Sequence, residues 1–438
     1  MDNQPDLLND AKAVLKGNDA GGYTRPAPNL YPHQWLWDSC FVAIGLRHYD
    51  IDRAQQEILR LLAGQWADGM VPNMIFYGDT LWRRDKNLWR SWLNPNAPDK
   101  VATSGITQPP MLAEAIVRIG DSLSQSERRS WYKQVYPALL SYHQWLYHDR
   151  DPTGSGLILQ IHPYETGLDN TPPWLELIHL NHKPNWIKFI EKTHFDKVLN
   201  MLRRDTRRIL PGERMNTIDA LLYYNMIRRL RRKRYDITVI LPKSNLAIED
   251  LTFNCIFIRA NQHLKAIAKE IRQELPDEML ANIELSQSAL EKLWDPYSNQ
   301  YYSRDHRTQT AIKSPTIAAL MPLYTGLVPK ERLPRLIEML EDEHKFGTTY
   351  PVPSVPADSS WFSPHMYWQG PTWLNINWLL IDGLQRSGYP DHAAALRESS
   401  IELVRRNGFY EYFSPLDGSP AGAADFSWTA SLTIDLLQ

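Results

Sequence analysis

The chain has 438 residues, with 48 basic and 50 acidic side chains and two cysteines. A formal net charge of −2 gives no overall field to attract nucleic acid or a membrane surface, and 43% hydrophobic residues exclude a disordered chain. Glycine is scarce, at 21 residues, whereas 16 Trp and 21 Tyr are numerous. Aromatic residues in this number either fill a large core or line a cavity.

Helical periodicity dominates the chain, because apolar residues recur at three- and four-residue spacing. The predicted helices cover residues 40–49, 53–65, 109–119, 126–148, 195–209, 217–234, 248–273, 276–294, 316–323, 330–342, 372–386, 392–406 and 426–437. One β-branched run, 235–241, indicates a short strand or an extended connector. This pattern excludes Rossmann and TIM architectures. It favours an all-α fold, either a helical bundle, a solenoid or a closed α/α barrel, and a solenoid is less favoured because no fixed-period repeat is present. Low glycine content together with about a dozen helices favours one large domain, residues 1–438, over several smaller ones.

Three long segments interrupt the helices, at residues 66–107, 150–186 and 343–370. They are rich in proline and crowded with Trp, Tyr, His and Asp. Loops of this length in a compact domain are usually functional or disordered, and their aromatic content argues against disorder. We therefore expect ordered, aromatic-rich loops over one face of the helical scaffold, covering a pocket.

Other features have plain structural interpretations. Cys40 and Cys255 lie in apolar helical patterns and are expected to be two buried thiols. The basic run Arg228–Arg234 continues a helix and is interpreted as its solvated C-terminal end, where cations suit the helix dipole. No apolar stretch of 18 residues and no signal peptide is visible, so the expected location is cytoplasmic, without a membrane partner. We predict neither a metal nor a cofactor, and the sequence leaves a homo-oligomer open.

Four segments combine carboxylates with aromatic residues, at 31–39, 162–173, 367–373 and 408–415. Carboxylates accept hydrogen bonds from sugar hydroxyls, and indole faces stack on pyranose rings. Glycosidic cleavage needs two carboxyl groups, one of them a proton donor. Asp169 precedes two prolines and Trp174, apolar neighbours that could keep a carboxylic acid protonated, and Glu411 lies among aromatic residues. Asp38 is also interpreted as the N-cap of the following helix.

These segments resemble glycoside hydrolase family 63, in the clan that includes the family 37 trehalases. The similarity is greatest to the short mannosylglycerate and glucosylglycerate hydrolases and runs nearly end to end. It is carried by eight fragments in order: Trp35-Leu-Trp-Asp-Ser39, Gly69-Met-Val-Pro-Asn73, Thr103-Ser-Gly-Ile-Thr-Gln-Pro109, Gly167-Leu-Asp-Asn-Thr-Pro172, Tyr367-Trp-Gln-Gly-Pro371, Asn377-Trp-Leu-Leu380, Glu411-Tyr-Phe413 and Phe426-Ser-Trp-Thr429.

The resemblance implies an (α/α)6 barrel and an inverting α-glycosidase, with Asp169 as general acid and Glu411 as general base. Glu165 is the rival carboxylate for either role. The residues expected to bind the sugar substrate are Tyr31, Trp35, Trp37, Asp38, Gln108, Tyr164, Glu165, Arg214, Tyr367, Trp368, Gln369, Gly370 and Trp373. Two departures stand out. Tyr164 occupies a position where relatives often have Trp, and the segment 214–220 keeps Arg214 for a glycerate carboxylate but lacks the expected Tyr.

The favoured substrate is therefore an α-linked glucoside or mannoside, with glucosylglycerate or mannosylglycerate first. A trehalase-like enzyme or an oligosaccharide α-glucosidase is the competitor within the class. A non-catalytic sugar-binding barrel is a further alternative, although both carboxylates are present. Terpene cyclases and prenyltransferases also use helical barrels, but they need Asp-rich diphosphate motifs or a zinc site that this sequence does not contain.

Overall fold

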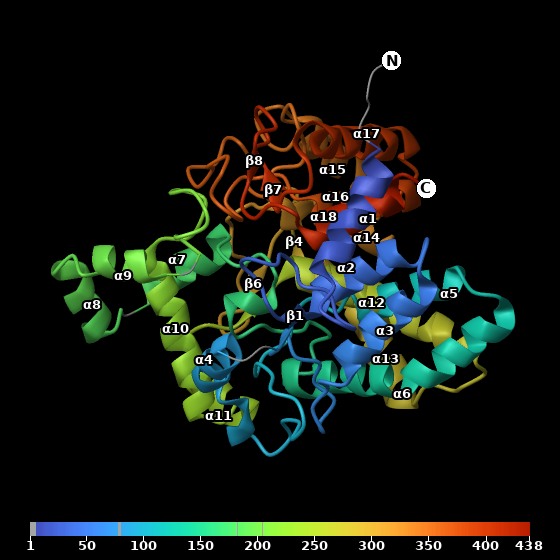
Figure 1. The fold of residues 1–438 in the computed structure, drawn as a ribbon, viewed down its shortest axis with the longest axis horizontal. Coiled ribbons are helices and arrows are strands. Elements are labelled where there is room, and N and C mark those ends of the chain that lie inside the picture. Colours follow the sequence, from blue (N-terminus) through green and yellow to red (C-terminus); the bar gives the residue numbers. More distant parts are fainter. Residues whose placement is uncertain (1–5, 78–79, 182, 204) are drawn as a thin grey trace.

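The computed structural model describes residues 6–77, 80–181, 183–203 and 205–438 (Figure 1). Helices make up most of this part of the chain, and each of its strands is only two residues long. The predicted all-α class is therefore confirmed. Most predicted helices are present with small shifts of their ends. For example, the helix predicted at 126–148 spans Gln125–Arg150 and begins with a capping box at Ser124 and Glu127.

A series of six helices forms the centre of the molecule, each in contact with the next and the last in contact with the first. In order they are α2 (Leu36–Leu46), α5 (Leu112–Asp121), α12 (Leu251–Glu270), α14 (Pro322–Thr325), α16 (Leu374–Arg386) and α18 (Ser427–Leu436). Every residue of α2 is buried, as expected for a helix that is surrounded by others. We refer to these six as the inner helices.

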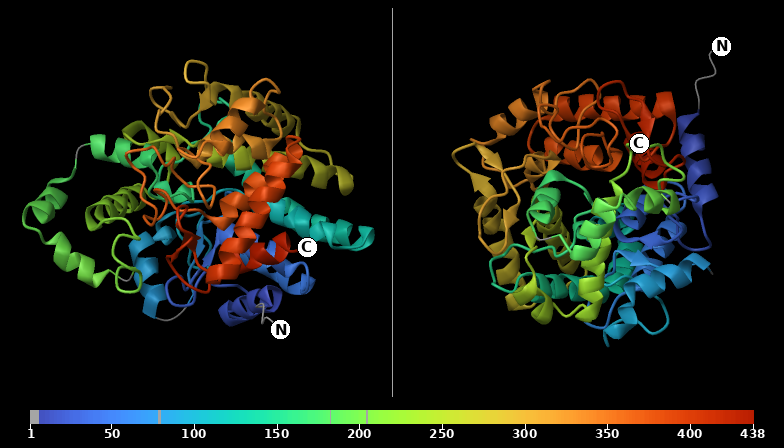
Figure 2. Two further views of the ribbon diagram at one scale, coloured as in Figure 1. Left: turned by 90° about the horizontal axis from the view of Figure 1, so that it is seen from above. Right: turned by 90° about the vertical axis from the view of Figure 1, so that its left-hand side faces the viewer.

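A second set of helices packs on the outside of the inner helices. These are α1 (Leu7–Asn18), α3 (Ile51–Leu62), α6 (Gln125–Arg150), α13 (Asp277–Ala289), α15 (Leu333–Glu341) and α17 (Pro390–Asn407). They are one-sided: α3 buries Ala54, Ile58 and Leu61, at spacings of four and three, and exposes much of its other face. The two ends of the chain meet in this arrangement, since α1 packs on α18 (Figures 1 and 2).

The remaining helices lie to one side of the inner helices, at the left of Figure 1. They are α4 (Thr80–Trp89), α7 (Pro172–Leu180), α8 (Asn185–Lys192), α9 (Asp196–Leu202), α10 (Thr217–Arg232) and α11 (Ile237–Ile240). A small second core holds this part together, with Trp174 of α7, Ile187 of α8 and Tyr223 of α10 fully buried. As predicted, the basic run closes a helix: α10 ends at Arg232, and Arg231 donates to the Leu88 carbonyl of α4.

Short elements join the helices. The strands pair antiparallel as β1 (Gln34–Trp35) with β2 (Met74–Ile75), β3 (Ile248–Glu249) with β6 (Arg304–Asp305), β4 (Trp294–Asp295) with β5 (Gln300–Tyr301), and β7 (Tyr412–Phe413) with β8 (Pro420–Ala421). The 3-10 turns are η1 (Ser91–Leu93), η2 (Pro163–Glu165), η3 (Leu241–Lys243), η4 (Leu290–Leu293) and η5 (Ile317–Leu320).

Three predictions about elements were wrong. The run 235–241 is not extended; the Asp236 side chain caps Thr238 and starts the short helix α11. The helix predicted at 195–209 ends at Leu202, and the chain then turns at Asp205, which pairs with Arg203. The segments 66–107 and 150–186 were expected to be loops but contain α4, α7 and the start of α8. The segment 343–370 is non-helical, as expected.

The two thiols, Cys40 in α2 and Cys255 in α12, are buried and unpaired, which confirms the prediction. Across the part of the chain that the structure describes, no helix is both long and apolar enough to cross a bilayer.

Candidate active site

A cavity of about 350 Å³ opens at the N-terminal ends of α2 and α18, facing α7 and α10. This volume lies within the range that small-molecule sites occupy. Most of the predicted site residues line it: Tyr31, Trp35, Trp37, Asp38, Gln108, Tyr164, Asp169, Arg214, Tyr367, Trp368 and Glu411. Residues as far apart in sequence as Tyr31 and Glu411 thus meet at one place.

Glu411 lies on this cavity directly before β7 and is only 2% exposed. Its Oε1 accepts a hydrogen bond from the Tyr31 hydroxyl at 2.9 Å, and its Oε2 accepts from the backbone N–H of Ala423 at 3.0 Å. The buried Arg214 guanidinium forms an ion pair with the same Oε2. A guanidinium and two further hydrogen-bond donors therefore hold the Glu411 carboxylate in place.

Asp169 stands before α7, whose first two helical residues are Pro172 and Pro173. Burial raises the pKa of Asp169 to about 8, and the nearby charge of Glu411 adds to the rise, although the Tyr367 hydroxyl and Arg214 act in the opposite direction. The Tyr367 hydroxyl lies 3.2 Å from Asp169 Oδ2. Asp169 is thus a carboxylic acid that keeps its proton near neutral pH, whereas Glu411 is paired with a cation.

Asp38 is the third carboxyl group of the cavity. It was expected to cap α2, but α2 begins at Leu36, so Asp38 lies inside the first helical turn and Trp35 occupies the cap position. Burial, together with the charges of Glu411 and Asp169, raises the pKa of Asp38 well above its ordinary value. Two of the three carboxyl groups of this cavity, Asp38 and Asp169, therefore have a raised pKa.

The walls of the cavity are aromatic. Trp368 stacks in parallel on Trp373 with ring centroids 3.7 Å apart, and Trp37 lies 6.1 Å from Trp368. Several polar atoms at this wall are buried and find no hydrogen-bond partner within the described chain: Trp35 Nε1, Gln108 Oε1, Arg214 Nε and Trp428 Nε1. Buried polar atoms without partners are costly, so these atoms point to a polar ligand rich in hydroxyl groups.

Four predicted site residues do not line the described cavity. Glu165 is buried and paired with Arg150 at 2.8 Å, and it also accepts from the Ile161 N–H. Trp373 supports Trp368 from behind. The Gln369 side chain donates to the Asn170 carbonyl at 3.0 Å, and a Cβ at Gly370 would lie 2.3 Å from the Ser363 carbonyl oxygen. These residues hold the walls in place rather than face the cavity.

Other lining residues were not predicted. They are Pro26, Leu30, Gly167, Arg203, Asp205, Met215, Ala220, Phe426 and Trp428. Gly167, Phe426 and Trp428 stand inside fragments that carried the family resemblance, so that signal could have identified them. Arg203 and Asp205 gave no such signal, because the periodicity of residues 195–209 placed them on a continuous helix. In the structure, Arg203 pairs with both oxygens of Asp205, at 3.1 and 2.6 Å.

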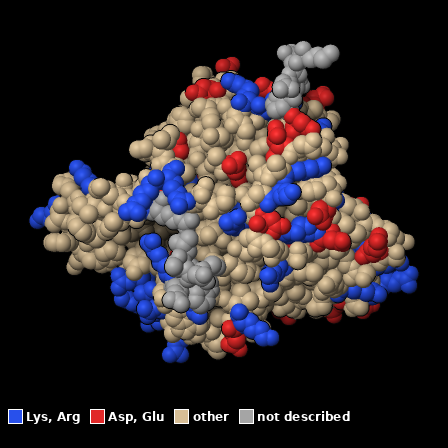
Figure 3. Space-filling view, viewed as in Figure 1, with Lys and Arg blue, Asp and Glu red and all other residues tan. Residues whose placement is uncertain are grey.

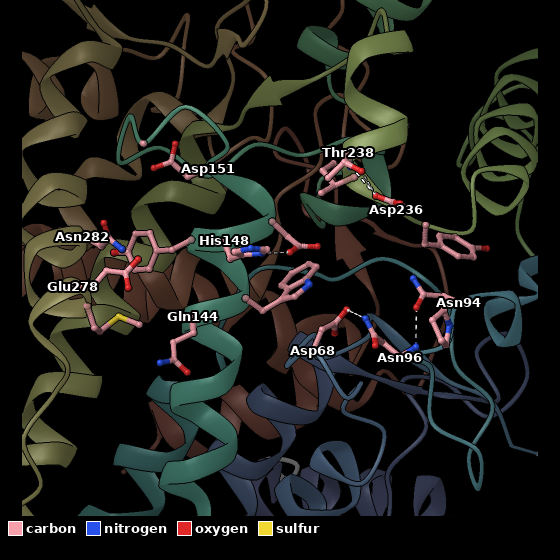
Figure 4. Close-up of a pocket in the computed structure, with 18 of the residues that line it drawn as sticks. Asp68, Asn94, Asn96, Gln144, His148, Asp151, Asp236, Thr238, Glu278 and Asn282 are labelled. Atoms are coloured by element: carbon pink, nitrogen blue, oxygen red, sulfur yellow. Dashed lines mark hydrogen bonds and ion pairs between the residues drawn. The ribbon is translucent and has the colours of Figure 1, made fainter.

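A larger cavity, of about 860 Å³, lies between α6, α13 and the segment 234–238 (Figure 4). Several of its acidic side chains bind neighbouring groups: Asp68 accepts from Asn96, and Asp236 accepts from the Thr238 hydroxyl and N–H. Its described lining includes none of the predicted site residues. The smaller cavity, with its carboxyl pair and unpartnered polar atoms, is therefore the candidate active site.

Comparison with known proteins agrees with this choice. Residues 31–429 match the family described as the mannosylglycerate hydrolase MGH1-like glycoside hydrolase domain. A mannosylglycerate hydrolase of Thermus thermophilus is 36% identical, covering 97% of this chain and 99% of its own. A glucosylglycerate hydrolase of Mycolicibacterium hassiacum is 30% identical, covering 98% and 96%. The crystal structure of a family 63 mannosylglycerate hydrolase from Thermus thermophilus with Tris and D-glycerate superposes with a TM-score of 0.87, at 34% identity and 99% and 100% coverage.

The family match, with which the paired carboxyl groups on an aromatic-walled cavity agree, shows that this protein is a glycoside hydrolase. The chain belongs to the MGH1-like glycoside hydrolases of family 63, as the resemblance of its sequence fragments implied.

Proposed function

We propose that this glycoside hydrolase cleaves an α-linked mannoside or glucoside of glycerate with inversion at the anomeric carbon. The observation that carries the proposal is the contrast between two carboxyl groups of one cavity, Asp169 with a pKa raised to about 8 and Glu411 held by a guanidinium. Acid–base catalysis requires two groups in different environments, one that holds its proton until it donates it and one that accepts a proton. The names of the relatives supply the substrate.

In this mechanism Asp169 donates its proton to the glycosidic oxygen, so that the aglycone leaves as an alcohol. Glu411 takes a proton from a water molecule, which attacks the anomeric carbon from the opposite face of the sugar. Inversion requires the two carboxyl groups to be about 6.5–9.5 Å apart, which leaves room for that water. The Tyr31 hydroxyl and the Ala423 N–H, which both donate to Glu411, fix the orientation of this carboxylate.

The aglycone leaves from the side of Asp169, and its carboxylate needs a cation there. Arg214 contributes a buried guanidinium with an unpartnered Nε. Arg203, which is paired with Asp205, lines the same cavity. Its charge lowers the pKa of the Tyr164 hydroxyl, whereas the charge of Asp169 raises it, so both groups lie near Tyr164. We propose that these two arginines bind the glycerate, with Arg203 compensating for the missing Tyr, and that Trp37, Asp38, Gln108 and Trp368 bind the sugar.

We also propose that the fold is an (α/α)6 barrel in a single domain covering residues 1–438. The closed series of contacts among the six inner helices supports this architecture, as does the outer set of α1, α3, α6, α13, α15 and α17. The site then lies at the end of the barrel where α2 and α18 begin.

The test is incubation with mannosylglycerate, glucosylglycerate, trehalose and kojibiose, with NMR detection of the first anomer released. We expect hydrolysis of one or both glycerate compounds and initial release of the β-anomer. Initial release of the α-anomer would contradict inversion. Turnover of trehalose or kojibiose alone would assign the other substrate class.

Variants test the two carboxyl groups. We expect Asp169→Asn and Glu411→Gln each to lower kcat by about 10²–10⁴-fold, the usual contribution of acid–base catalysis. Because Glu411→Gln leaves the Arg214 charge unpaired, Glu411→Asp serves as a second variant that keeps the charge but withdraws the carboxylate. Circular dichroism melting checks that each variant is folded. Normal kcat in a folded Asp169→Asn protein would refute the assignment of the acid.

A further inference from the structure

Glu213 is a buried carboxyl group directly before Arg214. Charged side chains are spread over the face of the molecule that Figure 3 shows, where water stabilises them, but Glu213 is only 7% exposed. It forms no ion pair with any residue that the structure describes, since the Arg214 guanidinium is paired with Glu411. Burial of a carboxyl group costs free energy unless its oxygens accept hydrogen bonds, so the partners of Glu213 indicate its role.

Glu213 holds the hairpin that carries Glu411 at two points. This hairpin consists of β7 and β8, and Glu411 directly precedes β7. The Glu213 Oε2 accepts a hydrogen bond from the N–H of Gly422, which follows β8, at 3.0 Å. The Glu213 carbonyl oxygen accepts one from the hydroxyl of Tyr412, in β7, at 2.5 Å. Glu213 therefore joins the segment between α9 and α10 to both sides of the hairpin.

The hydrogen bond to Gly422 fixes the stretch of backbone that holds Glu411. The next residue, Ala423, donates its N–H to Glu411 Oε2 at 3.0 Å, and its carbonyl oxygen accepts from the Glu411 N–H at 2.9 Å. Gly422 has φ +76°, a conformation that glycine adopts readily but that its own backbone freedom does not enforce. The peptide groups on either side of Gly422 therefore depend on partners elsewhere in the chain, and Glu213 is the partner of the first.

We infer that Glu213 is a positioning residue for the catalytic base. By holding the Gly422 N–H, it sets the direction of the adjacent Ala423 N–H and thereby the place of the Glu411 carboxylate. The inference rests on the proposed role of Glu411 as the base. Glu213 itself does not line the described cavity, so it acts through the hairpin and not on the substrate.

The proposed acid is held by different contacts. The Tyr223 hydroxyl of α10 donates to the Asp169 carbonyl oxygen at 2.5 Å, and the Asn170 side chain accepts from the Trp368 N–H at 2.8 Å. Neither contact involves the β7–β8 hairpin. Loss of the Glu213 side chain should therefore impair the attack of water and leave the donation of the proton by Asp169 intact.

Glycosyl fluorides separate the base from the acid. When α-mannosyl or α-glucosyl fluoride is hydrolysed with inversion, the C–F bond breaks and fluoride leaves with the bonding electrons. A water oxygen bonds to the anomeric carbon, and Glu411 takes the proton that this water loses. Because fluoride leaves without a proton, Asp169→Asn should lose far less activity on the fluorides than on the glycerate glycosides. A fluoride also has no aglycone carboxylate, so a loss of glycerate binding would not affect its turnover.

Glu213→Leu removes the acceptor of the Gly422 N–H. We expect kcat to fall about 10–100-fold on both kinds of substrate, the scale of a misplacement near 1 Å, while KM for the fluoride stays near the wild-type value. Glu213→Gln keeps an oxygen acceptor and should restore most of kcat. Tyr412→Phe removes only the hydrogen bond to the Glu213 carbonyl. It should lower kcat on the fluoride in the same direction, and it replaces Glu213→Leu if that variant does not fold.

Asp151→Leu is the matched control. Asp151 is 8% exposed, and its Oδ2 accepts at 2.7 Å from the N–H of Gly156, a glycine with φ +81°, but it lies outside the active site. This variant should lose stability in urea unfolding as Glu213→Leu does, yet keep the wild-type kcat.

Wild-type kcat on the fluoride in a folded Glu213→Leu protein, or equal losses in Glu213→Leu and Glu213→Gln, would overturn the inference alone. A loss confined to KM for the glycerate glycosides would also overturn it and would assign Glu213 to binding of the aglycone. A wild type that hydrolyses neither the fluorides nor the glycerate glycosides would contradict the proposed function, and the inference with it.

Discussion

The fold raises the pKa of Asp169, the residue that we propose as the general acid. Burial raises its pKa to about 8, so the protonated form dominates below that pH and is lost above it. If Asp169 is the general acid, kcat/KM of the ligand-free enzyme should fall as pH rises through about 8, with a slope of one proton. A pH–rate profile checks this. A profile that stays flat to pH 10 would mean that another group donates the proton.

The same raised pKa predicts an effect on stability. The folded state holds the Asp169 proton more tightly than the unfolded state, so the contribution of Asp169 to stability is complete below the unfolded pKa of 3.8 and is lost as pH rises through about 8. Asp169→Asn has no proton to lose. We therefore expect its melting temperature to exceed that of the wild type increasingly from about pH 5 to about pH 9. A constant difference over this range would contradict the predicted linkage.

The position of Glu411 depends on a glycine that faces it. Gly422 has φ +76°, and a Cβ there would lie 2.7 Å from Glu411 Oε2. Gly422→Ala should therefore displace the carboxylate and lower kcat about 10–100-fold, the scale of a misplacement near 1 Å. Gly388→Ala is the control, because it has φ +84° but no atom within 4 Å of the new Cβ. Equal kcat in the two variants would show that Gly422 does not position Glu411.

At the residue scale, the sequence predicted the carboxyl groups of the cavity better than the residues that hold them in place. Asp169 and Glu411 stand in short fragments with apolar or aromatic neighbours, and that local context is visible in the sequence. The Arg214–Glu411 ion pair joins residues 197 positions apart, so local spacing carries no information about it. The absence of a Tyr from the segment 214–220 is visible in the sequence, but the place of Arg203 on the cavity is not, because it depends on the turn at Asp205.

At the scale of elements, η2 contains a carboxylate, Glu165, that sequence alone could not separate from the proposed catalytic pair. Glu165 is 1% exposed and paired with Arg150 at the end of α6. We expect Glu165→Gln to reduce the free energy of unfolding by about 3–5 kcal/mol, because it leaves the buried Arg150 charge uncompensated. Urea unfolding measures the loss. The folded enzyme should keep a kcat near the wild-type value; a large fall in kcat with unchanged stability would make Glu165 the catalytic rival.

Helices were predictable where one face is buried against the rest of the molecule, as in α3 and α15, since that burial produces the apolar period. Prediction failed where local chemistry decides the element. Pro172 and Pro173 begin α7, because proline suits the first turn of a helix, although two prolines in sequence suggested a loop. The helix predicted at 195–209 was too long, since the apolar residues of α9 are exposed rather than packed on the core.

At the scale of the whole molecule, the order of the inner helices could not be derived from periodicity, because it is set by contacts between remote segments. The contact between α18 and α2 joins the last helix to one that begins at residue 36. It depends on small residues as well as apolar ones: a Cβ at Gly45 would lie 2.2 Å from the Ser431 hydroxyl oxygen. Low glycine content indicated many helices, but only the structure shows that this glycine lets two of them close the series.

The Asp435 carboxylate connects three of the helices or helix ends at which the series closes. Asp435 of α18 accepts from Arg47 and His48, both at 2.7 Å, and from Trp378 of α16 at 2.8 Å. Although burial opposes its charge, the His48 hydrogen bond and the Arg47 guanidinium lower the pKa of Asp435 to about 2. Its contribution to stability is therefore present above the unfolded pKa of 3.8 and is lost as pH falls through about 2.

We accordingly expect Asp435→Asn to lower the free energy of unfolding by about 2 kcal/mol near pH 7, since one pKa unit corresponds to about 1.4 kcal/mol. The difference from wild type should shrink as pH falls from about 4 toward 2, because protonation removes the same charge from the wild-type protein. Urea unfolding at several pH values measures both effects. Glu398→Gln, at an exposed position of α17, is the control and should change stability by less than about 0.5 kcal/mol. A loss for Asp435→Asn that does not vary with pH would mean that α18 is held by packing rather than by this charge.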